Sequence, residues 1–247
     1  MHLKISDMDM LHGSLAGKLL LFTLPIALSS MVQQLFNAAD TAVAGHFGSA
    51  NALAAVGTNT EIIALIVTVS SGLSIGANVL IAKHVGRNEA EKLPAAVQTA
   101  MRLAMCIGVI GLLLGQIAAA PLLRLIRTPE EIFDAAALYL RIYMLGYPFL
   151  LLYDFGAACL RARGDSRYPF LALLLSGFAN VGLNLLFTAG LRMGVAGVAI
   201  ATDLSTMLSA FLVLRRLAKD AVFRFAILNQ RSARNGVWSI LKTGIPS

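Results

Sequence analysis

Charged residues, cysteine and histidine are all scarce in this 247-residue sequence. Asp, Glu, Lys and Arg make up 13% of it, against roughly 25% in a typical soluble domain, and 57% of the residues are hydrophobic. The two cysteines, Cys106 and Cys159, fall in or beside apolar segments without disulfide or metal-ligand spacing, and we expect packed thiols. No H-E-x-x-H, Walker or CxxC pattern occurs, which argues against zinc chemistry and ATP-driven pumping. These shortages exclude an ordinary soluble domain.

Long uncharged runs take the place of the missing charge. Four runs of at least 21 residues contain no charged side chain, and two more are interrupted once, by Arg141 or by Asp203. At about 1.5 Å per helical residue, such a run crosses the roughly 30 Å hydrocarbon layer of a bilayer. The runs do not alternate between apolar and polar residues, which excludes a transmembrane β-barrel. We therefore predict an all-α integral membrane protein, a six-transmembrane-helix bundle. The runs are Leu19–Ala39, Ile62–Ala82, Leu103–Leu123, Tyr168–Leu191, Ala135–Tyr153 and Val195–Leu214.

The placement of the positive charges predicts the topology. With the N-terminus in the cytoplasm, 14 Lys and Arg residues lie in cytoplasmic segments, and only Arg124, Arg127 and Arg192 lie in outer loops. The positive-inside rule accounts for this asymmetry, so the net charge of +7 requires no nucleic-acid partner. We expect a multi-pass protein of the cell (inner) membrane with a cytoplasmic N-terminus and the lipid bilayer as its surroundings.

Composition divides the chain into four predicted parts. The parts are a cytoplasmic tail (1–14), a six-helix transmembrane lobe (15–217), a basic cytoplasmic linker (218–237) and the truncated start of a seventh helix (238–247). The last part repeats the pattern of Lys18–Ile26, with proline at the same place after an apolar lead-in. Because repeats are common in transporters, we expect the chain to be about half of a longer protein, with a second six-helix lobe as its partner.

Caps and prolines predict the helix boundaries. Thr128 is the expected N-cap of the fourth helix, with Pro129 at its first position and its end near Arg161. Pro25 and Pro148 are expected to bend helices one and four. The other expected helices are Leu15–Ala44, Ala52–Lys83, Ala95–Ala120, Pro169–Ala189 and Val195–Leu217.

Polar side chains within these apolar helices are the main evidence about function, because they are costly in lipid. On the first and fifth helices they recur at helical spacing and so share a face, and the sixth helix carries five more. They are Gln33, Asn37, Asp40 and Thr41 on the first helix; Ser176, Asn180, Asn184 and Thr188 on the fifth; and Thr202, Asp203, Ser205, Thr206 and Ser209 on the sixth.

Depth in the bilayer brings some of these residues together. Helices one and five run outward, so Asp40 and Asn184 lie late in their spans; helices four and six run inward, so Tyr139 and Thr202 lie early. All four fall in the outer half. A carboxylate among amide and hydroxyl oxygens suits a small hard cation, and a buried carboxyl equally suits a proton. The alternative is ordinary interhelical hydrogen bonding, worth about 0.6 kcal/mol per bond.

An enzyme is not expected. The stretch Gly72–Gly76 matches G-x-S-x-G, but a serine nucleophile needs a base within reach, and no helix after the second carries a histidine. The glycine pairs Gly72-x-x-x-Gly76 and Gly111-x-x-x-Gly115 instead predict close helix contacts.

Several ordered motifs resemble the multidrug and toxic compound extrusion (MATE) family over nearly the whole chain. They lie in residues 24–45, 72–86, 161–169 and 180–202, and include Asn37-Ala-Ala-Asp40 and Asn180-x-x-x-Asn184. The resemblance implies twelve helices in two six-helix lobes around a central cavity, with this chain as the N-lobe. It also implies export of organic cations or other amphipathic drugs against inward H⁺ or Na⁺, without a cofactor.

The resemblance also implies site residues. Asp40 matches the acid of the N-lobe, Asn180 and Asn184 match the pair on the fifth helix, and Tyr139 and Thr202 match further positions of the cluster. Many members have aspartate where Asn184 stands, so Asp40 is the clear proton carrier here. Further candidates are Gln34, Asn37 and Asp203, the last standing where an apolar residue is expected.

Two other functions stay open at this point. A lipid-linked oligosaccharide flippase of related architecture would line its cavity with several cationic residues for a pyrophosphate group, whereas the spans here offer only Arg102 and Arg141. A non-transporting half-protein is the third interpretation.

Overall fold

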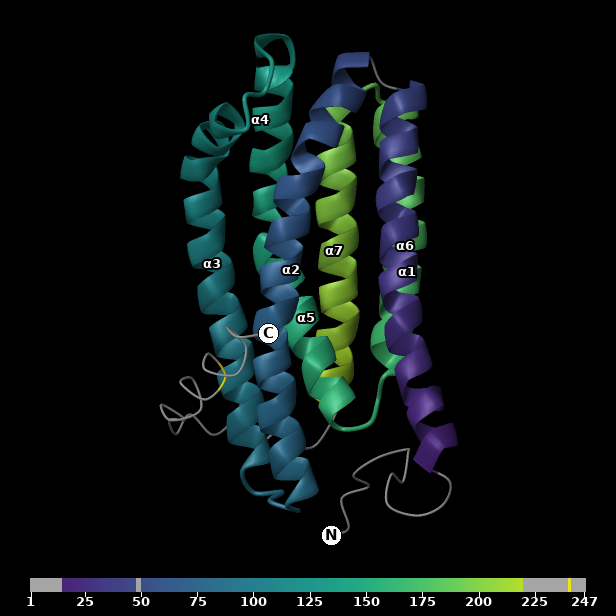
Figure 1. The fold of residues 1–247 in the computed structure, drawn as a ribbon. Helices are drawn as coiled ribbons and strands as arrows, with labels where there is room; N and C mark the ends of the chain where they lie inside the picture. Colours follow the sequence, from purple (N-terminus) through teal and green to yellow (C-terminus); the bar gives the residue numbers. More distant parts are fainter. Residues whose placement is uncertain (1–14, 48–49, 220–239, 241–247) are drawn as a thin grey trace.

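A computed structural model describes residues 15–47, 50–219 and 240 and shows a bundle of long helices (Figure 1). The expected tail, nearly all of the linker and all but Ile240 of the expected seventh-helix segment lie outside the described residues. Successive long helices run in opposite directions, so their ends gather at the two ends of the bundle. In chain order the elements are α1 (Leu15–Phe47), α2 (Ala50–Gly86), α3 (Leu93–Leu125), α4 (Glu130–Leu145), α5 (Tyr147–Ala162), α6 (Arg167–Asn184), the π-helix η1 (Leu185–Gly190) and α7 (Gly194–Lys219).

The helices fit the predicted membrane protein. By length and composition, α2, α3, α7 and the segment Arg167–Gly190 can each cross a membrane, and the bent pair α4 and α5 makes a fifth span if taken together. The segment α1 has 33 residues but is not among these candidates, so the count of six spans stays a prediction. Large apolar side chains such as Leu113 and Ile117 point outward, which is the stable arrangement when the solvent is lipid.

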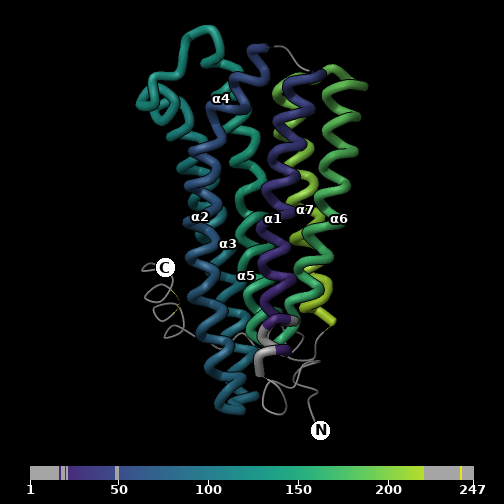
Figure 2. Tube along the Cα trace, turned by 45° about the vertical axis from the view of Figure 1, so that its right-hand side comes forward, coloured from purple at the N-terminus to yellow at the C-terminus, as the bar shows by residue number. Residues whose placement is uncertain are grey.

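Helix α5 lies at the centre of the packing. It contacts α2, α3 and α7, while α7 also packs against α4 and α6. Helix α1 packs mainly on α6; Figure 1 shows both at one edge of the bundle, and they are again neighbours in Figure 2. The buried core combines small side chains such as Ala77 and Ala104 with the larger Leu151, Phe155 and Val213. This arrangement places the polar faces of α1, α6 and α7 against one another.

The fourth predicted helix is broken at Gly146. Helices α4 and α5 meet there at an angle of 45°, and Pro148 lies in the first turn of α5. Proline lacks an N–H and fits a first turn, so the expected bend in this helix is confirmed. Helix α1, in contrast, runs through Pro25 as one continuous element.

The predicted start of this helix is wrong by one position. Helix α4 begins at Glu130, and Pro129 (φ −57°, ψ 141°) occupies the cap position instead of the first turn. The Thr128 hydroxyl makes no cap hydrogen bond; its oxygen is buried and has no hydrogen-bond partner among the described residues. Proline fixes its own extended backbone at the boundary, and this leaves Thr128 too far from the free N–H groups to cap them.

Glycine residues let α3 approach the break between α4 and α5 closely. A Cβ at Gly108 would meet Pro148, one at Gly111 would overlap Tyr147, and one at Gly115 would meet Met144. The close contact predicted from Gly111-x-x-x-Gly115 is therefore confirmed.

The expectation of packed thiols holds only for Cys159, which is buried, because Cys106 on α3 is exposed. A thiol behaves as a small hydrophobic group with a weak donor, so it can face lipid as well as the core.

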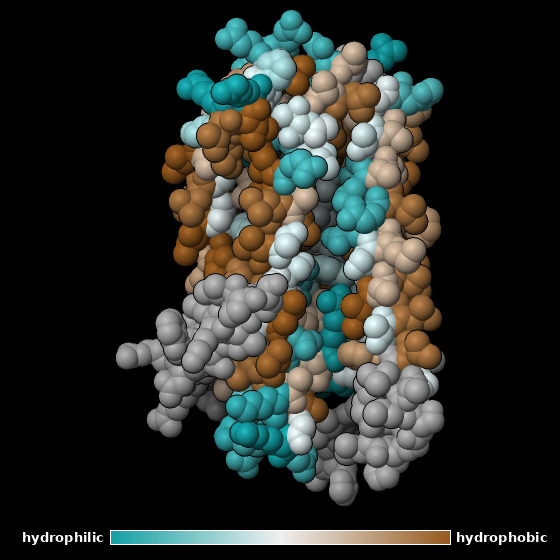
Figure 3. Space-filling view, in the orientation of Figure 1, coloured by the Kyte–Doolittle hydropathy of each residue, from teal (hydrophilic) through white to brown (hydrophobic). Residues whose placement is uncertain are grey.

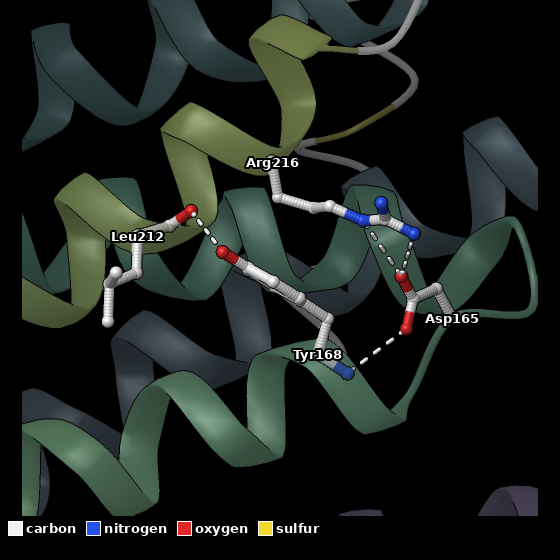
Figure 4. A network of polar contacts seen from close by, with 4 residues as sticks. All are labelled: Asp165, Tyr168, Leu212 and Arg216. Atoms are coloured by element: carbon white, nitrogen blue, oxygen red, sulfur yellow. Dashed lines mark hydrogen bonds and ion pairs between the residues drawn. The ribbon is translucent and has the colours of Figure 1, made fainter.

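Most charged residues in the described part of the chain lie at the two ends of the bundle. At the end where α2, α5 and α7 finish, a polar network joins the loop after α5 to α7 (Figure 4). Asp165 accepts a hydrogen bond from the Tyr168 N–H (3.0 Å) and pairs with Arg216 (3.3 Å). The guanidinium of Arg216 lies 5.4 Å from the Tyr168 ring centre, and the Tyr168 hydroxyl donates to the Leu212 carbonyl (3.3 Å). We call this end the basic end. Its cationic residues are Lys83, Arg87, Lys92, Arg161, Arg163, Arg167, Arg215, Arg216 and Lys219.

Candidate functional site

Asp40 is the centre of a polar cluster that joins three helices. Its side chain on α1 is 7% exposed. Asn184 Nδ2 on α6 donates a hydrogen bond to Asp40 Oδ1 (2.5 Å), and Thr202 Oγ1 on α7 donates to Asp40 Oδ2 (3.3 Å). Each carboxylate oxygen thus has its own partner from a different helix. The spacing of polar residues along α6 predicted a shared face, and the structure aims that face at α1.

Asn180 connects the other members of the cluster. Asn184 Nδ2 also donates to Asn180 Oδ1 (3.3 Å), and Asn180 Nδ2 donates to Thr202 Oγ1 (3.5 Å). Thr202 additionally lies 3.0 Å from the Val198 carbonyl oxygen. A hydroxyl has one proton to donate, so Thr202 bonds either Val198 or Asp40 at a given moment. The cluster can therefore rearrange without moving a helix.

Two oxygen atoms, one on the Asn184 amide that bonds Asp40 and one a turn further along the chain, are buried without a hydrogen-bond partner in the described part of the chain. They are Asn184 Oδ1 and Thr188 Oγ1. The π-helix η1 begins immediately after Asn184 and contains Thr188. π-helical turns widen the backbone and occur often at functional sites. Unpartnered oxygens next to a carboxylate are the kind of ligand that a small hard cation would take.

A cavity of about 270 Å³ opens beside the cluster. Asp40, Asn180 and Thr202 line it together with Tyr139 and the apolar side chain Val67. Figure 3 shows a band of hydrophilic and intermediate residues running between hydrophobic flanks on this face. The other polar side chains that line the cavity are Gln33, Gln34, Asn37, Thr41, Thr60, Thr68, Tyr143, Tyr153, Ser176, Ser205, Thr206 and Ser209. A membrane domain with a carboxylate at such a cavity has the features of a transport site.

Comparison with known proteins identifies the family. The sequence model of MatE matches residues 25–186 of this chain. The chain belongs to the MatE family. The matched range contains Asp40, Asn180 and Asn184 and ends before Thr202.

Curated MatE-like relatives match over most of this chain. The probable multidrug resistance protein YoeA of Bacillus subtilis is 32% identical over 198 residues, covering 78% of this chain and 42% of its own. A second Bacillus subtilis protein, the probable multidrug resistance protein YpnP, is 30% identical over 97% of this chain and 54% of its own. The probable multidrug resistance protein NorM of Thermotoga maritima is 28% identical over 93% of this chain and 50% of its own. The chain spans about half the length of the curated relatives it matches.

Solved structures match a similar share of this chain. A MATE structure in the bent conformation superposes with a TM-score of 0.88 at 25% identity, covering 95% of this chain and 52% of that one. An outward-facing multidrug resistance MATE transporter of the MOP superfamily superposes with a TM-score of 0.85, covering 93% of this chain and 51% of that one. An inward-facing one superposes with a TM-score of 0.80, covering 92% of this chain and 52% of that one, and both are 25% identical to this chain. The outward-facing and inward-facing proteins are described as transporters, so the expectation of a non-enzyme holds at the level of the family. The chain is a multi-pass membrane protein of this fold.

Three predicted site residues of this MatE chain line the cavity without joining the cluster. Tyr139 is 4% exposed and stacks at 6.5 Å from Tyr143, but it makes no hydrogen bond to Asp40 in the described structure. Gln34 and Asn37 are exposed on the cavity face of α1, and no hydrogen bond to Asp40 is formed by either within residues 15–219. They are placed to meet a molecule inside the cavity.

Asp203 lies away from the cavity. It follows Thr202 directly on α7, and residues one apart point in different directions on a helix. Its carboxylate accepts a hydrogen bond from the Gly146 N–H at the break between α4 and α5. The structure therefore places Asp203 at a helix break and not in the Asp40 cluster.

Two polar residues in the interior of the bundle, the buried Asn59 and the partly buried Asp154, were not among the predicted site residues. Asn59 on α2 is fully buried, and its Nδ2 donates to the carbonyls of Ala55 (2.8 Å) and Ala136 (3.0 Å), tying α2 to α4. Asp154 on α5 lies directly after the apolar run that was taken to end at Tyr153. The available signal was an acid in the middle of a predicted span, with Arg161 seven residues later on the same helical face.

Proposed function

We propose that the protein containing this chain is a secondary active multidrug efflux antiporter. It exports organic cations or amphipathic drugs in exchange for H⁺ or Na⁺, and this chain supplies the N-lobe cation site. The proposal rests on the surroundings of Asp40. This carboxylate lies within a membrane lobe, accepts hydrogen bonds from α6 and α7, and lines a polar cavity. The curated relatives, which are named as probable multidrug resistance proteins, support the multidrug part of the proposal.

Protonation of Asp40 would change how α1 packs. The ionised carboxylate accepts charge-assisted hydrogen bonds from Asn184 and Thr202, and such bonds are about twice as strong as neutral ones. When Asp40 takes a proton it loses one acceptor site, and Thr202 can turn its hydroxyl to the Val198 carbonyl. Because α1 contacts mainly α6, the weakened bond to Asn184 frees α1 to shift against α6. Ion occupancy thereby alters the cavity wall.

H⁺ is the first candidate for the coupling ion. The cluster holds a single acid, and Asn184 presents to Asp40 its NH₂ group, which donates a hydrogen bond and cannot ligate a cation. A Na⁺ ion would require Asn184 to turn its unpartnered Oδ1 toward Asp40. By linkage, the ion and the drug must change each other's affinity by the same factor.

The proposal is tested by drug efflux from cells that express the full-length protein. Asp40→Asn is expected to abolish efflux while leaving the amount of protein in the membrane unchanged. Asp134→Asn is the matched control, because Asp134 is exposed near the start of α4. Everted vesicles with a pH gradient or a Na⁺ gradient imposed separately then identify the ion. Unchanged efflux by Asp40→Asn refutes the role of Asp40.

A lipid-linked oligosaccharide flippase is the second candidate and is less well supported. A pyrophosphate group calls for Lys or Arg in the cavity, yet the described residues that line it include none. The third candidate, an inactive half-protein, predicts no efflux from any form of the chain. Residues 1–247 alone are expected to lack efflux and to regain it when a second lobe is supplied.

A further inference from the structure

Asp154 is a second carboxyl group within the membrane lobe, in the half of the bundle opposite to Asp40. Asp40 lies seven residues before the end of α1, and Asp154 lies eight residues before the end of α5, at the basic end. At about 1.5 Å per residue, each group is therefore on the order of 10 Å inside its own end of the bundle. α1 and α5 finish at opposite ends (Figure 1).

The surroundings of Asp154 are polar but incomplete. The hydroxyl of Ser71 on α2 hydrogen-bonds to it. One turn further along α5, the Ala158 carbonyl accepts a hydrogen bond from Asn78 Nδ2 of α2 (3.0 Å). Asp154 Oδ2 is buried and has no hydrogen-bond partner in the described structure. The otherwise apolar interface between α2 and α5 thus contains two polar side chains of α2 close to the depth of Asp154.

The charge of an ionised Asp154 is poorly compensated. Arg161, two turns later on α5, is the charged group that acts on it. The two residues form no ion pair within the described ranges, and Arg161 Nε is itself buried without a partner. A buried carboxylate with an unpartnered oxygen bears the desolvation cost of that atom. Binding a proton removes this cost, and water reaching Oδ2 would allow the proton to leave.

The Asp40 cavity extends to the residue beside Asp154, although Asp154 itself does not line it. Tyr153, which precedes Asp154, lines the same cavity as Asp40 and Tyr143. Tyr143 lies within electrostatic reach of Asp40, Asp154 and Asp203. The ionisable groups facing Asp154 in the described structure are Tyr143 of α4 and Tyr153 and Arg161 of its own helix, while α2 presents the neutral Ser71.

We propose that Asp154, held by Ser71, is a second proton-binding site, which receives the proton released by Asp40 and delivers it to the basic end of the bundle. This inference rests on the proposed antiport function. The step balances simply: Asp40 loses a proton, Asp154 Oδ2 gains one through water in the cavity, and Asp154 later transfers it to water at the basic end. No bond other than O–H forms or breaks.

Infrared difference spectroscopy of the full-length protein in bilayers tests the proposal directly. Protonated carboxyl groups give C=O stretching bands that appear and disappear as pH is changed. Asp154→Asn is expected to remove one such band, Asp40→Asn a different one, and the matched control Asp134→Asn neither. Ser71→Ala is expected to shift the Asp154 band without removing it, because one hydrogen bond to that carboxyl is lost.

The outcomes separate this inference from the proposed function. Loss of a band in Asp154→Asn, together with loss of drug-driven proton release at the basic end, supports the second site. A spectrum of Asp154→Asn identical to that of the unmodified protein overturns it, even if Asp40→Asn abolishes efflux. If instead Asp40→Asn leaves efflux unchanged, the antiport function fails whatever the Asp154 band does.

Discussion

The carboxylate of Asp203 lies directly against the backbone of Gly146. A Cβ added at residue 146 would overlap Asp203 Oδ1 and Cγ and would lie 3.3 Å from its Cα. Gly146 has helical dihedral angles (φ −75°, ψ −14°), so its backbone alone does not require glycine. The contact with α7 requires it. This contact places an anion at the N-terminus of α5, where the helix dipole favours negative charge.

Gly146→Ala is therefore expected to destabilise the lobe by about 1–3 kcal/mol, the usual cost of overpacking. Asp203→Ala in the same chain removes the overlapping atoms, so the double variant is expected to lose less than the sum of the two single losses. Denaturant unfolding in mixed micelles measures all three variants.

Gly182→Ala on α6 is the matched control for this cycle. No atom lies within 4 Å of a Cβ at Gly182, and alanine favours a helix over glycine by about 1 kcal/mol, so stability should stay equal or rise. Strictly additive losses for Gly146→Ala and Asp203→Ala would contradict the proposed contact.

A second glycine holds α1 against α6 next to the Asp40 cluster. A Cβ at Gly177 would overlap the Phe36 ring, one turn of α6 before Asn180. We expect Gly177→Ala to push α1 away from α6, lengthen the bond between Asp40 and Asn184, and reduce efflux severalfold. Adding Phe36→Leu should restore part of the efflux, since a smaller side chain makes room. Efflux rates normalised to protein in the membrane decide between this and a simple loss of folding.

The sequence predicts the Asp40 cluster because its members carry local signals. Asn180 and Asn184 are four residues apart in an uncharged run, and the alternating direction of the helices sets their depth relative to Asp40. Hydrogen bonds at 2.5 Å and 3.3 Å then join residues 144 and 162 positions apart. Both the spacing and the depth follow from the one-dimensional pattern.

Other features depend on contacts that the pattern does not contain. In lipid a helix is apolar on nearly every side, so periodicity does not say which face meets which neighbour. For this reason Asp203 facing Gly146 and Asp154 facing Ser71 were not predicted. The π-helix after Asn184 and the exact start of α4 likewise depend on local backbone geometry and tertiary packing.

The loop between α2 and α3 provides a pH prediction outside the membrane spans. His84 Nδ1 lies 2.7 Å from Glu89 Oε2, and Lys92 Nζ lies 3.2 Å from Glu89 Oε1. The hydrogen bonds from His84 and then Lys92 lower the pKa of Glu89 below its ordinary value of 4.5. A depressed pKa means that these contacts contribute fully above pH 4.5 and are lost as the pH falls through the lower, folded-state pKa.

We expect His84→Ala to raise the pKa of Glu89 toward its ordinary value, and Lys92→Met to raise it less. Carbon-13 NMR of the Glu89 carboxyl, followed through an acid titration, measures the shift. A pKa of Glu89 that is the same in both variants and in the unmodified chain would contradict the hydrogen bonds.

The network at the basic end makes different predictions for its two charged members. Arg216 is half-exposed, so Arg216→Ala is expected to cost less than about 1 kcal/mol, as exposed ion pairs do. Asp165 also accepts the Tyr168 N–H near the start of α6, and Asp165→Ala should cost about 1 kcal/mol more, the usual value of a lost helix cap (Figure 4). Asp165→Asn separates the two contributions, because an amide oxygen can still accept the N–H but carries no charge for Arg216. If Asp165→Asn loses as much stability as Asp165→Ala, the charge pair dominates and the cap contributes little. If Asp165→Asn instead loses about as much stability as Arg216→Ala, the cap survives in the asparagine variant.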